Sequence, residues 1–220
     1  MVLTDAPDAA RWAAGRIADD LARAVAGRGS ASLALSGGRS PWVMMADLFA
    51  RPLPWERVDL LQVDERVAPD GDDRRNLTRM AELRVGTPAE AARLHAMPVA
   101  RGADHAVRAY RELLARLGGV IDVVQLGLGE DGHTASLPPG DPVLGEHRAL
   151  VAATARPFNG TIRVTLTYPA LDAAGDVVWL VTGADKRRMA RRLADGDRDI
   201  PAGRVAAASQ VLVLDREAAG

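Results

Sequence analysis

Short apolar runs alternate with longer amphipathic stretches along the whole chain. The runs are rich in β-branched residues and are bounded by Gly, Asp or Pro, which predicts buried strands. These strands are expected at residues 32–35, 58–63, 121–126, 151–153, 164–166, 177–181 and 211–214. The amphipathic stretches predict helices at residues 9–25, 41–50, 75–83, 103–117 and 184–194. Such alternation predicts an α/β fold, in which a mostly parallel sheet carries helices on both faces.

The length of the chain favours a single domain over residues 1–220. A chain of 220 residues is the size of one ordinary α/β domain or of two small ones. It contains no internal repeat and no low-complexity linker, and residues 138–142 and 196–203 are predicted to be loops. One domain is therefore the simpler prediction.

Composition excludes several classes of protein. The chain has 28 Lys and Arg against 29 Asp and Glu, and no cysteine. Without a basic arm or a block of like charge, it is not expected to bind nucleic acid or an anionic membrane. Without cysteine, it has neither a disulfide framework nor a thiolate metal site. No signal peptide and no apolar run near the roughly 20 residues of a membrane span are present, so we expect a cytoplasmic monomer or small homo-oligomer.

Ligands of such sheets sit beyond the carboxyl ends of the strands, so the residues after each strand are informative. After 32–35 the chain reads Ser36-Gly37-Gly38-Arg39-Ser40-Pro41 and then a predicted helix. Two glycines allow the backbone to approach a ligand closely, and the N–H groups of a helix start attract anions. The pattern G-x-x-x-x-G-K-[ST] of nucleotide-binding loops is absent. An anion site and a plain strand-to-helix turn both remain open here.

Charged residues also follow the next strand and begin a later one. Asp64-Glu65-Arg66 abuts the apolar run 58–63, where these residues either line the rim of a cleft or form a solvated loop. Arg163 precedes the strand 164–166, and Lys186 lies at the start of the helix 184–194. Lys186 is the only lysine, so 28 − 1 = 27 basic residues are arginine. Arg66, Arg163 and Lys186 are each interpreted as a surface charge or, together with the Ser-Gly-Gly turn, as a phosphate pocket.

The most informative segment is 127–136, which reads Gly-Leu-Gly-Glu-Asp-Gly-His-Thr-Ala-Ser. Its first six residues match G-x-G-x-x-G, but Glu130 and Asp131 would repel a pyrophosphate, and no acidic residue follows about 20 residues later to hold a ribose. What remains is a carboxylate, Asp131, two residues before an imidazole, His133. A carboxylate can fix the tautomer of a histidine, which makes His133 a candidate general base. The alternative is a histidine that only satisfies loop carbonyls.

The other three histidines, His95, His105 and His147, show no metal-ligand spacing. We therefore predict no metal and no cofactor. The residues alone predict a cytoplasmic α/β enzyme that holds a phosphorylated small molecule and uses His133 for water or proton chemistry.

These motifs together resemble the 6-phosphogluconolactonase family. The matching segments are 35–41, 63–66, 127–137, 163–165 and 183–186, in the order in which the family has them. The resemblance implies hydrolysis of 6-phospho-D-glucono-1,5-lactone to 6-phosphogluconate in the oxidative pentose phosphate pathway. It also implies the Rossmann-like fold of glucosamine-6-phosphate deaminase. The implied partner is a small sugar-phosphate lactone.

The resemblance also implies roles for individual residues. His133 would remove a proton from the attacking water, and Asp131 would orient the imidazole. The expected substrate-binding and phosphate-binding residues are Ser36, Gly37, Gly38, Arg39, Asp64, Arg66, Arg163 and Lys186.

Two other functions are compatible with parts of these motifs. Deaminases of the same superfamily continue after the histidine with Phe-Asn-Glu-Pro, whereas this chain has Ser136-Leu137-Pro138-Pro139, and proline cannot act as an acid or base. Arg66 also stands where deaminases have an aromatic residue. A sugar-phosphate-sensing transcription regulator would need a helix-turn-helix, yet only one long helix precedes the first predicted strand. Pro138 departs from the lactonase pattern, which has Phe there, so a different pocket wall is expected.

Overall fold

The computed structural model describes residues 1–220 and has a central sheet of seven strands, all parallel to their neighbours. Their order is β1-β10-β9-β6-β2-β3-β5. Their bounds are β1 Val2–Leu3, β2 Ala31–Leu35, β3 Val58–Gln62, β5 Arg93–His95, β6 Val123–Leu126, β9 Asp176–Val181 and β10 Gln210–Asp215. The predicted parallel α/β fold is confirmed.

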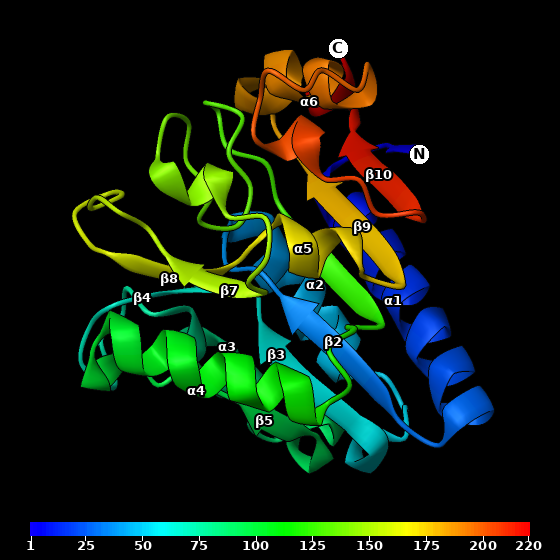
Figure 1. The fold of residues 1–220 in the computed structure, drawn as a ribbon. Coiled ribbons are helices and arrows are strands. Elements are labelled where there is room, and N and C mark those ends of the chain that lie inside the picture. The colour runs from blue at the N-terminus through cyan, green and yellow to red at the C-terminus, as the bar shows by residue number, and fades with distance from the viewer.

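Helices cover both faces of this sheet (Figure 1). Their bounds are α1 Ala6–Arg28, α2 Arg39–Phe49, α3 Asn76–Arg84, α4 Ala103–Arg116, α5 Tyr168–Asp172, α6 Arg187–Ala194 and α7 Arg216–Ala219. Buried side chains of α1, α2 and α3 pack on one face, and those of α4, α5 and α6 pack on the other. Each face therefore has its own hydrophobic core, and the central strands β2, β3, β6 and β9 between them are buried and mostly apolar.

Local signals set the ends of the long first helix. Asp5 caps its start, because the side chain accepts a hydrogen bond from the Asp8 N–H at 2.8 Å. Gly29 ends it in the left-handed conformation, with φ of 79°. Fully buried Ala13 and Ile17 lie on the face toward the sheet. The sequence therefore determines both the length and the orientation of α1.

A second, antiparallel sheet is the main departure from the predicted fold. It contains β4 Asp64–Arg66, β8 Arg163–Leu166 and β7 Val151–Ala153, in the order β4-β8-β7. We predicted the last two as strands, but the parallel pairing inferred for them is wrong. For Asp64–Arg66, the solvated loop is the wrong alternative, because these residues form a strand. The other alternative, a place at the rim of a cleft, agrees with Asp64 and Arg66 lining a cavity. Strands of three or four residues carry no periodicity that reveals their partner, so tertiary contacts decide the pairing.

Smaller differences concern short elements. The strands β1 and β5, which lie at the two edges of the parallel sheet, were not predicted. The predicted helix 184–194 is a 3₁₀ turn followed by α6. The 3₁₀ turns are η1 Trp55–Arg57, η2 Pro88–Ala91, η3 Val99–Arg101, η4 Pro142–Gly145, η5 Ala184–Lys186 and η6 Ala202–Arg204.

The predicted loop 196–203 packs against the turn that contains His133. Ile200 is buried, and a side chain on Gly132 would place its Cβ 2.8 Å from the Ile200 Cβ. The Ala202 N–H donates to the Gly132 carbonyl at 3.0 Å. This loop therefore supports the segment 127–136 from outside.

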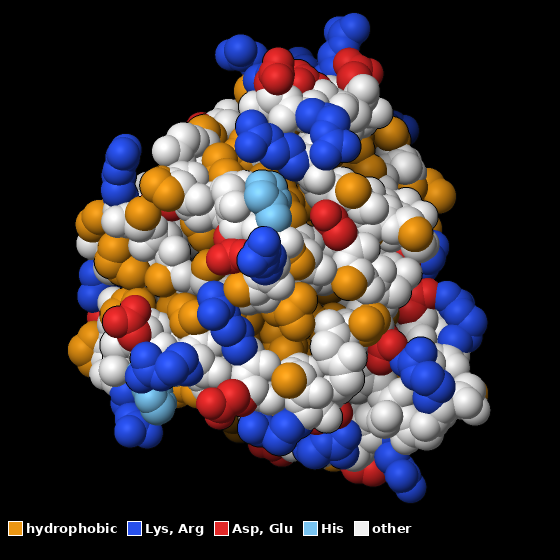
Figure 2. Space-filling view, in the orientation of Figure 1, with side chains coloured by type: hydrophobic (Ala, Val, Ile, Leu, Met, Phe, Trp, Pro, Cys, Tyr) orange, Lys and Arg blue, Asp and Glu red, His pale blue; other side chains and the backbone are white.

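The surface carries both signs of charge. On the face shown in Figure 2, Lys and Arg side chains lie among Asp and Glu rather than in a block of one sign. No helix of the structure is both long enough and apolar enough to span a bilayer.

Candidate active site

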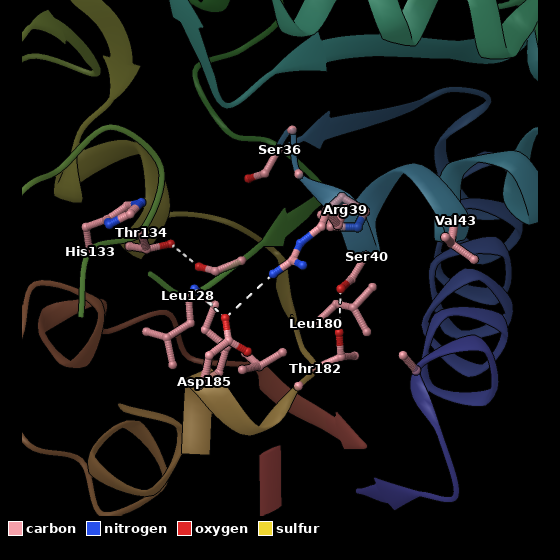
Figure 3. Close-up of a pocket in the computed structure, with 18 of the residues that line it drawn as sticks. Ser36, Arg39, Ser40, Val43, Leu128, His133, Thr134, Leu180, Thr182 and Asp185 are labelled. Atoms are coloured by element: carbon pink, nitrogen blue, oxygen red, sulfur yellow. Dashed lines mark hydrogen bonds and ion pairs between the residues drawn. The ribbon is translucent and has the colours of Figure 1, made fainter. Parts of the chain in front are cut away.

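A cavity of about 670 Å³ opens at the carboxyl ends of β2, β6 and β9. His133 and Thr134 lie on one side of it, and Arg39 and Ser40 lie at the start of α2 on another (Figure 3). The cavity lies where open parallel sheets bind ligands. Nine of the ten predicted site residues line it, namely Ser36, Gly37, Gly38, Arg39, Asp64, Arg66, His133, Arg163 and Lys186.

The Ser-Gly-Gly turn presents backbone donors to the cavity. A Cβ on Gly37 would lie 1.9 Å from Asn76 Oδ1, so this position excludes every side chain. The helix α2 begins without a side-chain cap, and no protein acceptor pairs with the N–H groups of residues 37–40. Unpaired N–H groups at a helix start favour an anion. The hydroxyls of Ser36 and Ser40 are engaged within the protein, because Ser36 Oγ donates to the Gln125 carbonyl and Ser40 Oγ contacts Thr182 Oγ1.

The strand β4 places Asp64 and Arg66 in the cavity wall. Asp64 is buried and accepts hydrogen bonds from Asn76 Nδ2 at 3.1 Å and Ser136 Oγ at 2.5 Å, and Arg163 Nη1 lies 3.7 Å from its carboxylate. Arg66 Nη1 donates to Asn76 Oδ1 at 2.5 Å and to the Arg74 carbonyl at 2.7 Å. Both acceptors are neutral, so the charge of Arg66 is uncompensated by a carboxylate partner. That charge remains available to an anion in the cavity.

Glu65 is a residue of this region that the sequence analysis did not single out. It is fully buried, and its carboxylate accepts the N–H groups of Arg66, Asn76 and Leu77, each at 2.8 Å. Gln62 Nε2 donates a fourth hydrogen bond at 2.8 Å. Glu65 therefore joins β4 to the start of α3. No sequence signal separates it from its neighbours Asp64 and Arg66, since only the structure shows which of the three side chains points away from the cavity.

The turn after β6 pairs Asp131 with His133. Asp131 Oδ1 lies 2.5 Å from His133 Nδ1 and also accepts the His133 N–H at 3.0 Å. The hydrogen bond from the imidazole lowers the pKa of Asp131 to about 2, so this carboxyl is ionised at neutral pH. A carboxylate only accepts, which assigns the proton to Nδ1 and the lone pair to Nε2. Asp131 itself does not line the cavity, and it reaches the site through His133.

Gly129 makes this pairing possible. A Cβ at Gly129 would lie 2.0 Å from His133 Nδ1 and 2.7 Å from Asp131 Oδ1. Only glycine therefore leaves room for the two side chains to meet. The Gly129 N–H donates to the His133 carbonyl at 2.8 Å, which closes the turn.

Phe158 links His133 to Arg163 and was missed by the sequence analysis. Its ring meets the His133 ring edge to face, with centroids 4.9 Å apart. The Arg163 guanidinium lies 5.0 Å from the centroid of the same ring, and Arg163 Nε donates to the Phe158 carbonyl at 3.1 Å. Phe158 lies between β7 and β8, and only their tertiary placement brings it to the site.

Lys186 and Arg39 are both paired with carboxylates. Lys186 Nζ lies 3.5 Å from Glu130 and 3.7 Å from Asp185. Arg39 extends toward Asp185, with its Nη2 3.6 Å from the carboxylate (Figure 3). The cations of the cavity therefore differ, since Arg66 lacks the acidic partner that Lys186 and Arg39 possess.

Two further expectations can be compared with the structure. Pro138 is buried but does not line the cavity, so the expected change of the pocket wall at this position is wrong. His95 contacts Asp59 outside the cavity. No group of three or more His, Asp or Glu side chains is arranged to hold a metal ion.

Comparisons with known proteins agree on one family. Residues 4–214 match the family described as glucosamine-6-phosphate isomerases/6-phosphogluconolactonase. A 6-phosphogluconolactonase of Mesorhizobium japonicum is 37% identical over 191 residues, covering 83% of this chain and 79% of the relative. One of Streptomyces coelicolor is 35% identical, covering 88% and 81%.

Solved structures agree with the sequence relatives. The crystal structure of a 6-phosphogluconolactonase from Shewanella baltica superposes with a TM-score of 0.88 at 25% identity, covering 97% of this chain and 95% of that one. A 6-phosphogluconolactonase structure from Trypanosoma brucei has the same fold, with a TM-score of 0.84 at 23% identity, covering 100% and 96%.

Proposed function

The chain belongs to the glucosamine-6-phosphate isomerase/6-phosphogluconolactonase family, and from that premise we propose that it hydrolyses 6-phospho-D-glucono-1,5-lactone with His133 as general base. The observation that carries the mechanism is the Asp131–His133 pair, which leaves the Nε2 lone pair of His133 free at a cavity that contains an arginine without a carboxylate partner. The two relatives named above match most of this chain and are named 6-phosphogluconolactonases, which supports the proposed substrate.

The reaction needs one base that later acts as an acid. His133 Nε2 accepts a proton from water while the water oxygen bonds to the lactone carbonyl carbon, C1. The carbonyl electrons move onto oxygen, and this oxyanion needs nearby N–H donors. When the carbonyl re-forms, the bond from C1 to the ring oxygen breaks and His133 returns its proton to that oxygen. The acid product then loses a proton to solvent, so water and lactone give 6-phosphogluconate. Asp131 holds the imidazole and stabilises its charged form.

The 6-phosphate is assigned to the cationic end of the cavity. Arg66 offers a guanidinium with no carboxylate partner, and Arg163 lies directly opposite it in the β4–β8 pair. The unpaired N–H groups of residues 37–40 face the same space, with Arg39 at the helix start. Lys186 contributes a point charge near the His133 turn, where Glu130 now pairs with it. Guanidinium forks and N–H groups together match the oxygens of a phosphate monoester.

A coupled assay tests the proposal. Glucose-6-phosphate dehydrogenase generates the lactone in situ, and 6-phosphogluconate formation is followed for wild type, His133→Ala and a blank without enzyme, since the lactone also opens in water. We expect wild type to exceed the blank and His133→Ala to lose about 10²–10⁴-fold in turnover. Wild-type activity equal to the blank would contradict the reaction. A change in KM alone for His133→Ala would contradict its assignment as base.

The expected cytoplasmic location forms part of the same proposal. A phosphorylated sugar carries charge that an apolar bilayer excludes, so the enzyme must share a compartment with its substrate. Cell fractionation followed by the lactonase assay checks this location. The monomer or small homo-oligomer expected from the sequence stays a prediction.

A further inference from the structure

A second cavity, of about 500 Å³, adjoins the first. The two share Gly38, Arg39, Arg66 and Arg163 in their walls. We use the name arginine annex for the part that belongs to the second cavity alone, which is lined by Trp42, Asp73, Arg74, Arg75, Arg79, Asn159 and Thr161. These residues come from α2, from the segment leading into α3, from α3 itself and from the β7–β8 connection. The annex therefore extends the cationic end of the candidate active site.

Arginine dominates the wall of the second cavity. Six of its 11 lining residues are arginine, namely Arg39, Arg66, Arg74, Arg75, Arg79 and Arg163. Asp73 is the only lining residue with a carboxylate. All except Arg66 have a carboxylate partner, but each of those partners lies outside this lining. Asp72 pairs with Arg74, and Glu82 pairs with Arg79. The remaining partners are Asp185 for Arg39, Glu65 and Asp70 for Arg75, and Asp64 for Arg163.

Such pairs leave donors unused on two arginines of the annex. A guanidinium has five N–H donors in a planar fork, and one carboxylate engages two of them at most in a bidentate pair. Arg74 uses Nε and Nη2 for Asp72, and Arg79 uses Nη1 for Glu82, so the remaining N–H groups of both stay free for an anion. Buried Arg75 is already held by Asp70 and the Met97 carbonyl. Arg66, at the junction of the two cavities, uses Nη1 for neutral acceptors only.

Neutral polar side chains complete the wall of the annex. Asn159 and Thr161, both from the β7–β8 connection, line it beside the arginines. Asn159 adopts the left-handed conformation with φ of 50° and brings an amide to this wall. Amide N–H groups donate hydrogen bonds and add no negative charge, so they suit an anion.

We propose that the annex binds the second phosphate of a diphosphate, inorganic or esterified, whose first phosphate occupies the substrate-phosphate position at Arg66 and Arg163. The inference rests on the proposed function for that first position. Because the cavities meet at these two arginines, directly linked phosphates reach both without an intervening spacer. Diphosphates therefore compete with the lactone. In a nucleoside diphosphate, the ring of Trp42 offers a stacking surface for the base.

Calorimetric titration of wild type with inorganic phosphate and with pyrophosphate, both without divalent cations, tests the annex. We expect pyrophosphate to bind at least about tenfold more tightly, since one charge-assisted contact supplies such a factor. Arg79→Gln removes an annex donor that lies outside the first cavity. This substitution should abolish the preference for pyrophosphate over phosphate. It should leave the affinity for phosphate and kcat/KM for the lactone unchanged. Arg191→Gln is the matched control. It removes one charge from α6 and breaks an exposed ion pair with Asp195, the residue that follows the helix.

ADP distinguishes the two sources of diphosphate. If the ligand is a nucleoside diphosphate, ADP binds more tightly than pyrophosphate and Trp42→Leu removes this gain; if it is inorganic, ADP gains nothing. Equal affinity for phosphate and pyrophosphate overturns the proposal, as does a preference that survives in Arg79→Gln or disappears in Arg191→Gln. Binding is read without turnover. A failed lactonase assay with the pyrophosphate preference intact therefore rejects the proposed function and retains the annex as a diphosphate site.

Discussion

A few side chains determine what the candidate site can do. The His133 imidazole has a defined tautomer because Asp131 accepts from Nδ1, and Gly129 leaves space for the pair. Phe158 contacts both His133 and Arg163. The proposed base and one of the proposed phosphate-binding arginines thus contact the same aromatic ring, so changes at this ring should affect chemistry and binding together.

Asp131→Asn should lower kcat by a part of the about 10²–10⁴-fold that a positioned acid–base group contributes. The amide neither stabilises a charged imidazole nor fixes the tautomer. Steady-state kinetics at neutral pH, where Asp131 is ionised, measure this loss. Glu130→Gln serves as the control for loss of charge, because Glu130 directly precedes Asp131 in the same turn but pairs with Lys186 instead of His133.

Asp131 also predicts a pH dependence of stability in the same comparison. Its folded pKa of about 2 lies below the ordinary value of about 3.9. A depressed pKa stabilises the fold fully above the unfolded value, and this stabilisation is lost as pH falls through the folded value. The free energy of unfolding of wild type should therefore approach that of Asp131→Asn between pH 4 and about 2. An unchanged difference over this range would contradict the pairing.

Phe158→Ala should both raise KM and lower kcat. The edge-to-face contact with His133 is worth about 0.5–1.5 kcal/mol, and the contact with Arg163 about 0.5–1 kcal/mol. Phe158→Ala removes both contacts, so neither the His133 imidazole nor the Arg163 guanidinium is held by this ring. Phe158→Leu keeps apolar volume without the aromatic ring and should lie between wild type and Phe158→Ala. If both variants reduce only the free energy of unfolding, with kinetics unchanged, Phe158 does not position these groups.

At the scale of elements, the junction of β3, β4 and α3 shapes the cationic wall. Glu65 accepts backbone N–H groups from both β4 and α3, so it fixes the strand that carries Arg66. Tyr110 of α4 contacts the same junction, because its hydroxyl accepts the Gln62 N–H at 2.7 Å. The short antiparallel sheet is therefore anchored to the parallel sheet through polar contacts.

Glu65→Gln should destabilise the protein by about 1–3 kcal/mol, since a buried acceptor for several N–H groups is weakened. KM for the lactone should rise as Arg66 loses its fixed position. Urea unfolding and steady-state kinetics measure the two effects. Glu82→Gln on α3 is a control with an exposed carboxylate that pairs only with Arg79. Lower stability with an unchanged KM would limit Glu65 to a structural role.

Different elements were predictable to different degrees. β2 and β3 are buried throughout and leave short, mostly apolar runs, so the sequence predicted them within a residue or two. Segments 36–41 and 127–136 were recognisable because glycines and charges directly follow strands. The pairing of β4, β8 and β7 was not predictable, because strands of three or four residues have no characteristic period. Phe158 and Glu65 were missed for a related reason, since their importance comes from partners distant in sequence.

At the scale of the molecule, the sheet joins the two ends of the described chain. The strand β10 lies between β1 and β9, and the amino group of Met1 donates to the Leu212 carbonyl at 2.9 Å. Both termini lie at the same side in Figure 1. The carboxylate of Asp215, at the end of β10, accepts the Gly183 N–H at 3.1 Å beside the cavity. The completed sheet thus also completes one wall of the site.

This arrangement has a consequence for synthesis on the ribosome. β10 is made after every other strand, yet it takes an internal place in the sheet. Until it emerges from the exit tunnel, β1 has no partner and β9 exposes a row of unpaired backbone groups. Such an edge can pair with other chains, so aggregation is favoured in the interval before β10 takes its place. A chain whose translation stops before residue 210 would contain the turn with Asp131 and His133. Its parallel sheet would still lack β10.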